Sequence, residues 1–297
     1  MNPRHRKHRG MSIALAITGA VFVLGPIATL IIQAAADSWR GSALLPQAFG
    51  ARGLRNTLGN PLVPAAIANS LLVATATVVV ALALAWPAAR SLAADGRRGL
   101  QLALLVPLLV PPLAIGEGLS PWFLRFGVAD TLFAIVLAHL VTVLPYVTLA
   151  LVPGFTPQLL EVEHAAATLG ARPIHRLRTA TIPALRRHLA LAVALGFTVS
   201  WSQYGTSLVV GGGIPMLPVV LVPFVRADPQ IAAVLDLIFL APPLLIVAIA
   251  AMTRQPGERE PHAATSRRAK RRLTTTDVRD NATTTATTET NTGLVGS

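Results

Sequence analysis

Long apolar segments recur along the chain and are separated by short polar stretches. A helix that crosses a bilayer needs ~20 mostly apolar residues. Six segments qualify: 11–33, 65–89, 100–119, 131–152, 188–210 and 231–252. Because backbone N–H and C=O groups in lipid must bond to each other, these segments are predicted to be helices. The pattern therefore predicts an all-α, polytopic membrane protein with six transmembrane helices.

Local signals refine these segments. The second segment is expected to open at Asn69-Ser70, after an outer loop, 36–64, with room for a short surface helix. The third carries Pro107, Pro111 and Pro112, and proline kinks a helix because it removes a hydrogen bond. We expect it to be the one clearly broken span, and the fifth span, 188–210, to end at the WSQYGTSLVVGGG stretch.

The composition is that of a membrane protein, and the distribution of basic residues indicates how the protein is oriented in the membrane. Of the 297 residues 53% are apolar and only 13% charged, and the mean hydropathy is +0.60; a soluble domain carries about 25% charged residues. With both termini in the cytoplasm, twenty of the 25 Lys and Arg residues fall on the cytoplasmic side. The positive-inside rule selects this orientation. Basic residues that set topology do not call for a nucleic-acid partner, and no aromatic–basic interleaving suggests one.

Three regions follow from this reading. Residues 1–64 form the N-terminal transmembrane helix and an external loop, and residues 65–252 form a core with a cytoplasmic loop at 155–187. Residues 253–297 are basic and Thr-rich, and are expected to be a disordered cytoplasmic tail. A solvated tail that reinforces the topology is favoured, and contact of its SRRAKRR cluster with membrane lipid is the alternative. There is no cysteine. No paired carboxylates, His cluster, nucleophile triad or phosphate-binding loop is present, so we expect no catalytic residue, metal or cofactor.

The cytoplasmic loop from Glu161 to Pro183 is the most informative stretch. Apolar residues recur at helical spacing and predict one apolar face, made by Leu159, Val162, Ala165, Ala166 and Leu169. Gly170 stands where a left-handed residue ends a helix, and Pro173 suits the first turn of a second helix, 174–179. The loop is thus expected to be a bent helix pair that another protein grips.

This loop resembles the cytoplasmic "EAA" loop of the type I, binding-protein-dependent permeases of ABC importers. Ala165, Ala166 and Gly170 fall in register with the family pattern, as do Ile182 and Pro183. His164 stands at the family's glutamate position, with Glu163 just before it. Three interpretations of this difference are open. Glu163 could take the glutamate's role after a small rotation of the helix, His164 could make docking pH-sensitive, or the change could be drift at a tolerant position.

The resemblance implies a type I ABC importer permease fold in the bacterial plasma (inner) membrane. The chain would form half of the solute pathway and hydrolyse nothing itself. Its implied partners are ABC ATPase subunits, an extracytoplasmic solute-binding protein and a second permease subunit, a different chain being favoured over an identical one. The implied ATPase-coupling residues are Glu163, His164, Ala165, Ala166, Gly170, Arg172, Pro173, Ile182 and Pro183.

Polar residues at membrane depth are candidates for the solute pathway. They are His139, Gln203, Tyr204 and Ser207. The alternative for these residues is hydrogen bonding between helices. The WSQY stretch is similar to the branch of the family that handles polyamines, thiamine, ferric iron and oxyanions, and it does not choose among them.

Two other functions fit a six-span protein. A secondary transporter would carry charges at the membrane midplane, broken helices and paired repeats, and this chain has few such features. A membrane scaffold protein could use the same loop for a partner other than an ATPase.

Overall fold

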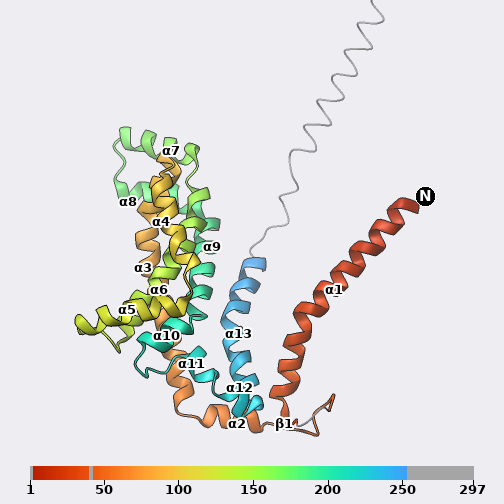
Figure 1. Cartoon of the computed structure of the whole chain (residues 1–297). Helices are drawn as coiled ribbons and strands as arrows, with labels where there is room; N and C mark the ends of the chain where they lie inside the picture. Colours follow the sequence, from red (N-terminus) through yellow and green to blue (C-terminus); the bar gives the residue numbers. More distant parts are fainter. Residues whose placement is uncertain (1–2, 40–42, 253–297) are drawn as a thin grey trace, which may run out of the picture. The chain divides into compact units, whose positions relative to one another are not determined.

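The computed structural model describes residues 3–39 and 43–252, which are mainly helical (Figure 1). The first part contains α1 (Pro3–Ala34), the hairpin β1 (Ala36–Ser38) and β2 (Ala48–Phe49), α2 (Arg52–Gly59), α3 (Leu62–Asp95), α4 (Arg98–Leu109), α5 (Pro112–Arg125) and α6 (Leu132–Leu151). The second contains the 3₁₀ turn η1 (Val152–Gly154), α7 (Pro157–Thr168), α8 (Pro173–Arg176), the π-helical turn η2 (Leu177–Thr181), α9 (Ile182–Trp201), α10 (Gly205–Val210), α11 (Leu217–Leu221), α12 (Phe224–Ala227) and α13 (Pro229–Met252). The predicted tail, 253–297, lies outside the described residues.

The predicted all-α, multi-span fold is confirmed. Within the described residues five helical segments are long and apolar enough to cross a membrane: Ile17–Ala34, Leu62–Asp95, Leu132–Gly154, Pro173–Trp201 and Pro229–Ile249. A sixth crossing arises if the bent pair Gly99–Leu109 and Pro112–Arg125 counts as one span. The short surface helix expected in the first outer loop is α2.

The third predicted span is not one kinked helix but two helices, α4 and α5, that meet at an angle of 101°. Val110 between them is extended, with φ −93° and ψ 128°. A residue before proline is pushed out of the helical region, and Pro111 follows Val110. The three prolines were recognised, but the turn is much sharper than a kink.

Two more span predictions need correction. The fifth span does not run on to Val210, because α9 ends at Trp201 and α10 begins at Gly205. The second span does not open at Asn69-Ser70, which lie two turns inside α3. The Asn69 Nδ2 donates to the carbonyl of Pro215 (3.0 Å), and the Ser70 Oγ accepts from the backbone N–H of Leu217 (2.9 Å). These polar residues tie α3 to the start of α11.

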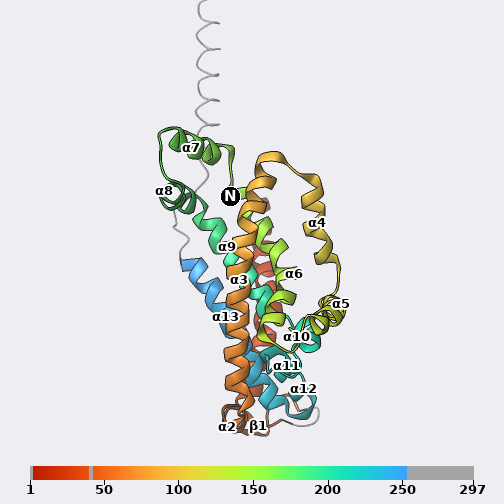
Figure 2. The same ribbon diagram turned by 90° about the vertical axis from the view of Figure 1, so that its left-hand side faces the viewer.

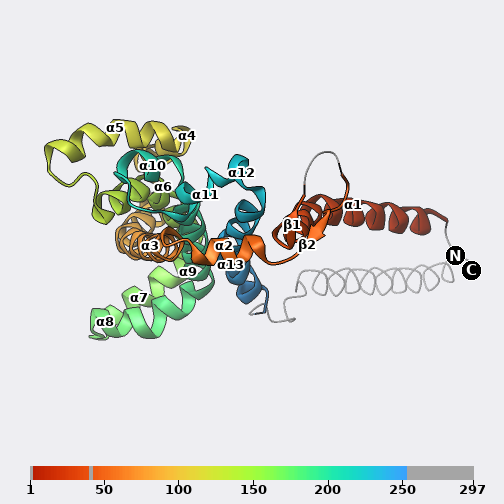
Figure 3. The same ribbon diagram turned by 90° about the horizontal axis from the view of Figure 1, so that it is seen from below.

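The centre of the fold is a bundle of α3, α6 and α9, which run side by side (Figures 1 and 2). Ala81, Ala85 and Ala89 stand four residues apart on α3. Their small side chains let the helices approach closely, as is common in membranes. The main core cluster contains Ala81, Ala85, Ala89, Val143, Val147, Leu151, Leu185 and Ala192. In Figure 3, α4 and α5 lie on the opposite side of this bundle from α7 and α8.

Arg52 joins the β1–β2 hairpin, α2 and α13 at the end of the bundle far from α7 (Figure 1). Its Nη1 lies 2.8 Å from Asp228 Oδ2, its Nη2 donates to Gln230 Oε1 (3.0 Å), and its Nε donates to the Asp37 carbonyl (3.1 Å). Burial raises the pKa of the Asp228 carboxyl, but hydrogen bonds from Arg52 and from the backbone N–H of Ile231 outweigh burial. The pKa of Asp228 is therefore lowered, and the carboxyl stays charged at neutral pH.

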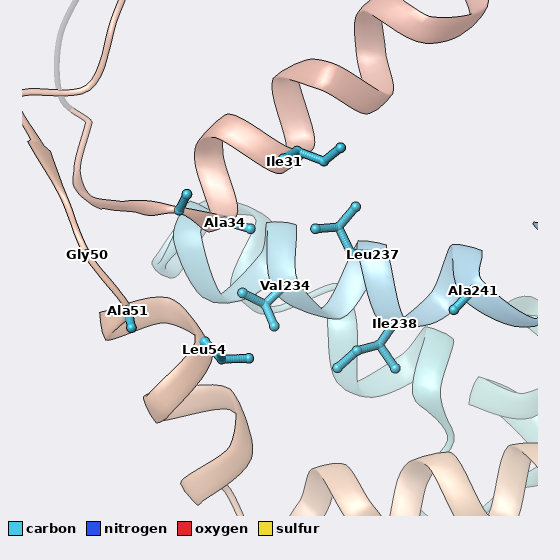
Figure 4. A pocket seen from close by; sticks show the side chains of 10 residues that line it. Ile31, Ala34, Gly50, Ala51, Leu54, Val234, Leu237, Ile238 and Ala241 are labelled. Atoms are coloured by element: carbon cyan, nitrogen blue, oxygen red, sulfur yellow. The ribbon is translucent and has the colours of Figure 1, made fainter.

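An apolar cavity of about 530 Å³ lies between the end of α1, the start of α2 and α13 (Figure 4). Its lining comprises Ile31, Ala34, Ala35, Gly50, Ala51, Leu54, Val234, Leu237, Ile238 and Ala241. Solute sites need a few placed polar groups, and no side chain of this lining is polar. This cavity therefore lacks the polar groups of a solute site.

Candidate functional site

The loop singled out from the sequence forms an arm at one end of the bundle (Figure 2). We define the arm as α7, α8 and η2, residues 157–181. The α7 helix begins after Thr156, whose Oγ1 accepts from the backbone N–H of Leu159 (3.3 Å). It ends at Thr168, and Gly170, just beyond the C-cap Leu169, has φ +78°. The N–H of Gly170 donates to the carbonyl of Ala167 and the N–H of Ala171 to that of Ala166, both at 3.0 Å. This is a Schellman motif, so the predicted turn at Gly170 is confirmed.

The second helix of the arm differs from the prediction. The α8 helix is a single turn, Pro173–Arg176, with Pro173 at its first position as expected. A π-helical turn, Leu177–Thr181, then leads directly into α9 at Ile182. The arm therefore joins α9 without a loop, and Ile182 and Pro183 form the first turn of α9.

The predicted apolar face of α7 is not one face, because some of its residues point into the bundle and others point away from it. Leu159 is buried and packs with Leu185 in the main core cluster. Val162 is exposed, and Leu169 has 87% of its surface exposed. The arm's end therefore presents apolar side chains to its surroundings.

Glu163 lies on the inward face of α7, one turn beyond Leu159, and only 3% of it is exposed. Its Oε2 lies 2.6 Å from Arg90 Nη1 of α3. Its Oε1 accepts from the Thr181 Oγ1 (2.5 Å), and its backbone carbonyl accepts from the Arg176 Nη1 (3.2 Å). From the sequence, Arg90 is only one of the twenty basic residues on the side predicted to be cytoplasmic, and nothing in the sequence points to Thr181. A buried carboxylate needs charged or hydrogen-bonding partners, but the sequence does not say which residues supply them.

The other predicted coupling residues lie on the outer side of the arm or at its base. His164, Ala165, Gly170, Arg172 and Pro173 are exposed, and Ala166 is half-buried; Ile182 and Pro183 are exposed at the base. The neighbouring Glu163 is buried, whereas His164, which stands at the family's glutamate position, is exposed.

A second group of polar residues lies inside the bundle where α9 breaks. His139 of α6 is completely buried. Its Nδ1 is 2.9 Å from Ser200 Oγ and its Nε2 is 3.0 Å from Ser207 Oγ. The Ser207 Oγ donates to the Gln203 carbonyl (2.6 Å). Because that hydroxyl proton is used, Nε2 must donate to Ser207 and Nδ1 accept from Ser200.

Gln203 completes this polar cluster. Its Nε2 donates to the Thr142 Oγ1 of α6, and its Oε1 accepts from Thr206 Oγ1 (3.3 Å). Three of the four predicted solute-pathway residues, His139, Gln203 and Ser207, are thus buried and bonded to the protein. Tyr204 differs, since 37% of it is exposed. Within the described residues no group of three or more His, Asp and Glu could hold a metal ion.

The sequence is similar to that of known transport proteins, although no model of a known protein family matches it. It is 24% identical over 252 residues to the putative 2-aminoethylphosphonate transport system permease protein of Salmonella typhimurium, covering 83% of this chain and 94% of that protein. It is 30% identical over 265 residues to the molybdenum transport system permease protein of Mycobacterium bovis, covering 83% of this chain and 92% of that protein.

The fold is similar to that of a chain from a bacterial ABC transporter involved in the import of the acidic polysaccharide alginate. The TM-score is 0.67 at 17% sequence identity, and the match covers 86% of this chain and 99% of that chain. The family resemblance seen in the loop therefore has support from whole-length similarity and from the fold. Neither a secondary transporter nor a scaffold is indicated. The chain belongs to the permease family of binding-protein-dependent ABC importers, and it is a transmembrane permease subunit.

Proposed function

We propose that the arm is the contact through which a separate ABC ATPase drives this permease. The observation that carries the proposal is the exposed apolar surface of the arm, made by Val162, Leu169 and Ile174. Exposed Glu161 and Arg178 lie on the same arm, and charged groups avoid hydrocarbon, so the arm stands in water. Exposed apolar side chains in water mark an interaction surface.

The arm's small and basic residues fit such a contact. Ala165 and Ala167 are exposed, and their short side chains let a partner backbone approach closely. Arg172 and His175 of the same arm are also exposed, and they would offer hydrogen-bond donors to an acidic rim on the partner. The distribution of Lys and Arg supports placing this end, and both termini, in the cytoplasm of a bacterium. The chain would then sit in the inner membrane, and the end with Arg52 would meet an external solute-binding protein.

The assembled importer would contain this chain, two ATPase subunits and a second permease, with a different chain favoured over an identical one. Residues 65–252 would form the working core with the coupling loop at 155–187, and residues 1–64 and 253–297 would flank it. The permease family supports these partners as a class. ATP hydrolysis would belong to the ATPase subunits.

The dock is tested by changing Leu169→Asp at the tip of the arm. A charge in the centre of an apolar contact is expected to weaken binding of the ATPase by roughly 30-fold or more, the effect of losing an interface hot spot of about 2 kcal/mol. Gly170→Pro should act in the same way, because the φ of +78° at this position is closed to proline. The measurement is co-purification of co-expressed ABC ATPase subunits with the tagged permease.

A matched control is Leu58→Asp, which makes the same change at an exposed leucine of α2, at the other end of the bundle. It should leave the amount of co-purified ATPase unchanged. If Leu169→Asp and Gly170→Pro both retain the ATPase and its solute-stimulated hydrolysis, the arm is not the dock.

The solute is a further proposal: we infer that it is an oxyanion. The names of the similar proteins mention a phosphonate, molybdenum and an acidic polysaccharide, and molybdenum occurs in aerated water as an oxyanion. The polar cluster of this chain has hydroxyl, amide and imidazole groups and no carboxylate. A cationic solute would be expected to meet acids. The donors of this cluster bond within the protein, so a donor to an oxyanion would have to lie beside the cluster. Tyr204 is the exposed donor beside this cluster.

The solute class is tested with the importer reconstituted from this chain, its ATPase, the second permease and the solute-binding protein. Sulfate, molybdate and 2-aminoethylphosphonate are compared with spermidine and thiamine as stimulators of ATP hydrolysis. We expect at least one of the anions to stimulate and both cations to be inactive. Stimulation by spermidine or thiamine alone contradicts the oxyanion assignment.

A further inference from the structure

We propose that Glu163 is a positioning residue whose buried carboxylate ties the arm to the bundle, so that a push on the arm moves α3 and α9 with it. The proposal rests on the proposed function, because the push comes from the ATPase. It assigns Glu163 a role distinct from docking, since its side chain faces α3 and not the outer surface of the arm.

Three elements meet at this carboxylate. Glu163 belongs to α7, Arg90 to the last turns of α3, and Thr181 to η2, the part of the arm that leads into α9. The carboxylate oxygens are 2.6 Å from Arg90 Nη1 and 2.5 Å from Thr181 Oγ1. Arg176 reaches back from α8 to the backbone carbonyl of the same residue, at 3.2 Å. We call these contacts the Glu163 clamp.

The clamp supplies a link that the covalent chain does not. The α7 helix joins α6 through the 3₁₀ turn Val152–Gly154, and it joins α8 through the Schellman turn at Gly170. Neither connection is α-helical, so each can bend. Arg90 is 73 positions away in sequence from Glu163, and its ion pair fixes α7 directly to α3. A buried carboxylate cannot leave such a partner cheaply, because it would remain charged and unpaired.

The Glu163 clamp determines how much of the arm's motion reaches the bundle. With the clamp in place, a displacement of α7 carries α3 and the base of α9 with it. Because α3, α6 and α9 pack together, the whole bundle follows. Without the clamp, α7 turns about its two bends while the bundle stays behind. The ATPase would then still dock and hydrolyse ATP, but little of its motion would reach the membrane.

The first test measures the link in the full-length chain in lipid nanodiscs. The protein has no cysteine, so Ala94→Cys on α3 and Gln158→Cys on α7, both at exposed positions outside the proposed dock, accept a pair of spin labels specifically. In the otherwise unchanged chain the distribution of label separations should be narrow. Glu163→Gln should broaden it, because the amide loses the ion pair with Arg90.

Two comparisons make this result specific. Glu161→Gln removes the same charge from an exposed residue of the same helix, and it should leave the distribution narrow. Arg90→Gln breaks the same ion pair at the partner that is more exposed, since 40% of the Arg90 side chain is accessible. It provides a second test of the ion pair if Glu163→Gln folds poorly. The double variant Arg90→Glu with Glu163→Arg restores an ion pair between the same two positions. It should therefore give a narrower distribution of label separations than either Arg90→Gln or Glu163→Gln.

The second test uses the complex with the ATPase. ATP should leave the label separation unchanged in the parent protein and shift it in Glu163→Gln, while co-purification of the ATPase is retained. Solute transported per ATP should fall roughly tenfold or more, since loss of a buried ion-pair partner is a large perturbation. The proposal is overturned if Glu163→Gln matches Glu161→Gln in label separation, with and without ATP. If no ATPase binds even the parent, the proposed dock fails, and the label widths in the chain alone still decide whether the clamp exists.

Discussion

Replacing Gly205 by valine is expected to push α10 away from α5 and to destabilise the protein by about 1–3 kcal/mol, the usual cost of overpacking. A Cβ at Gly205 would lie 2.9 Å from the backbone N of Leu113 and 3.1 Å from its Cα. These are backbone atoms, so no side chain can swing aside to make room. The measurement is the thermal unfolding midpoint of the purified full-length chain in detergent.

Gly118→Val on α5 is the matched control, because a Cβ there would meet nothing within 4 Å. Valine has a slightly better helix propensity than glycine, so this variant should unfold at the same temperature as the parent or slightly above it. The α10 helix also carries Thr206 and Ser207 of the polar cluster, so Gly205→Val should reduce transport as well. An unchanged midpoint for Gly205→Val would show that α5 and α10 do not touch through their backbones.

The contact between α5 and α10 illustrates what the sequence could not reveal. Hydropathy located the membrane segments well, because their length and composition are set by the bilayer. The helix breaks between Trp201 and Gly205, where the sequence has no proline that would predict a break. The break depends on α10 turning to pack on α5 through Gly205 and on Gln203 reaching Thr142, and both are contacts between distant parts of the chain. A local apolar run carries no information about them.

The arm shows the same division between local and distant causes. Gly170 was predicted correctly because a left-handed residue at a helix end is a local requirement with a local signal. The inward turn of Glu163 was missed because it depends on Arg90, a residue that reads from sequence alone as one of many basic residues at the end of a span. The apolar stripe was split for a related reason: Leu159 packs into the bundle core, and this places Val162 and Leu169 on the outside.

Replacing His139 by leucine is expected to cost about 1–3 kcal/mol of stability, the penalty for leaving a buried hydroxyl without a partner. Leucine fills a similar space but offers Ser200 no acceptor and Ser207 no donor. Ser207 keeps its bond to the Gln203 carbonyl, so Ser200 bears most of the loss. Hydrogen bonds between membrane helices are worth only about 0.6 kcal/mol on average. The unpaired hydroxyl, more than the lost bond itself, therefore sets the size of the effect.

The measurement is the free energy of unfolding of the full-length chain in detergent, compared between single and double variants. Adding Ser200→Ala to His139→Leu should recover much of the lost stability, because removing both partners leaves no unpaired group. Thr77→Val is the control: its buried Oγ1 has no hydrogen-bond partner in the described structure, so its loss should be neutral or stabilising. If His139→Leu abolishes solute-stimulated ATP hydrolysis at unchanged stability, the imidazole contacts the solute. Recovery of both stability and hydrolysis in the double variant would instead show that His139 acts by holding α6 to the broken end of α9.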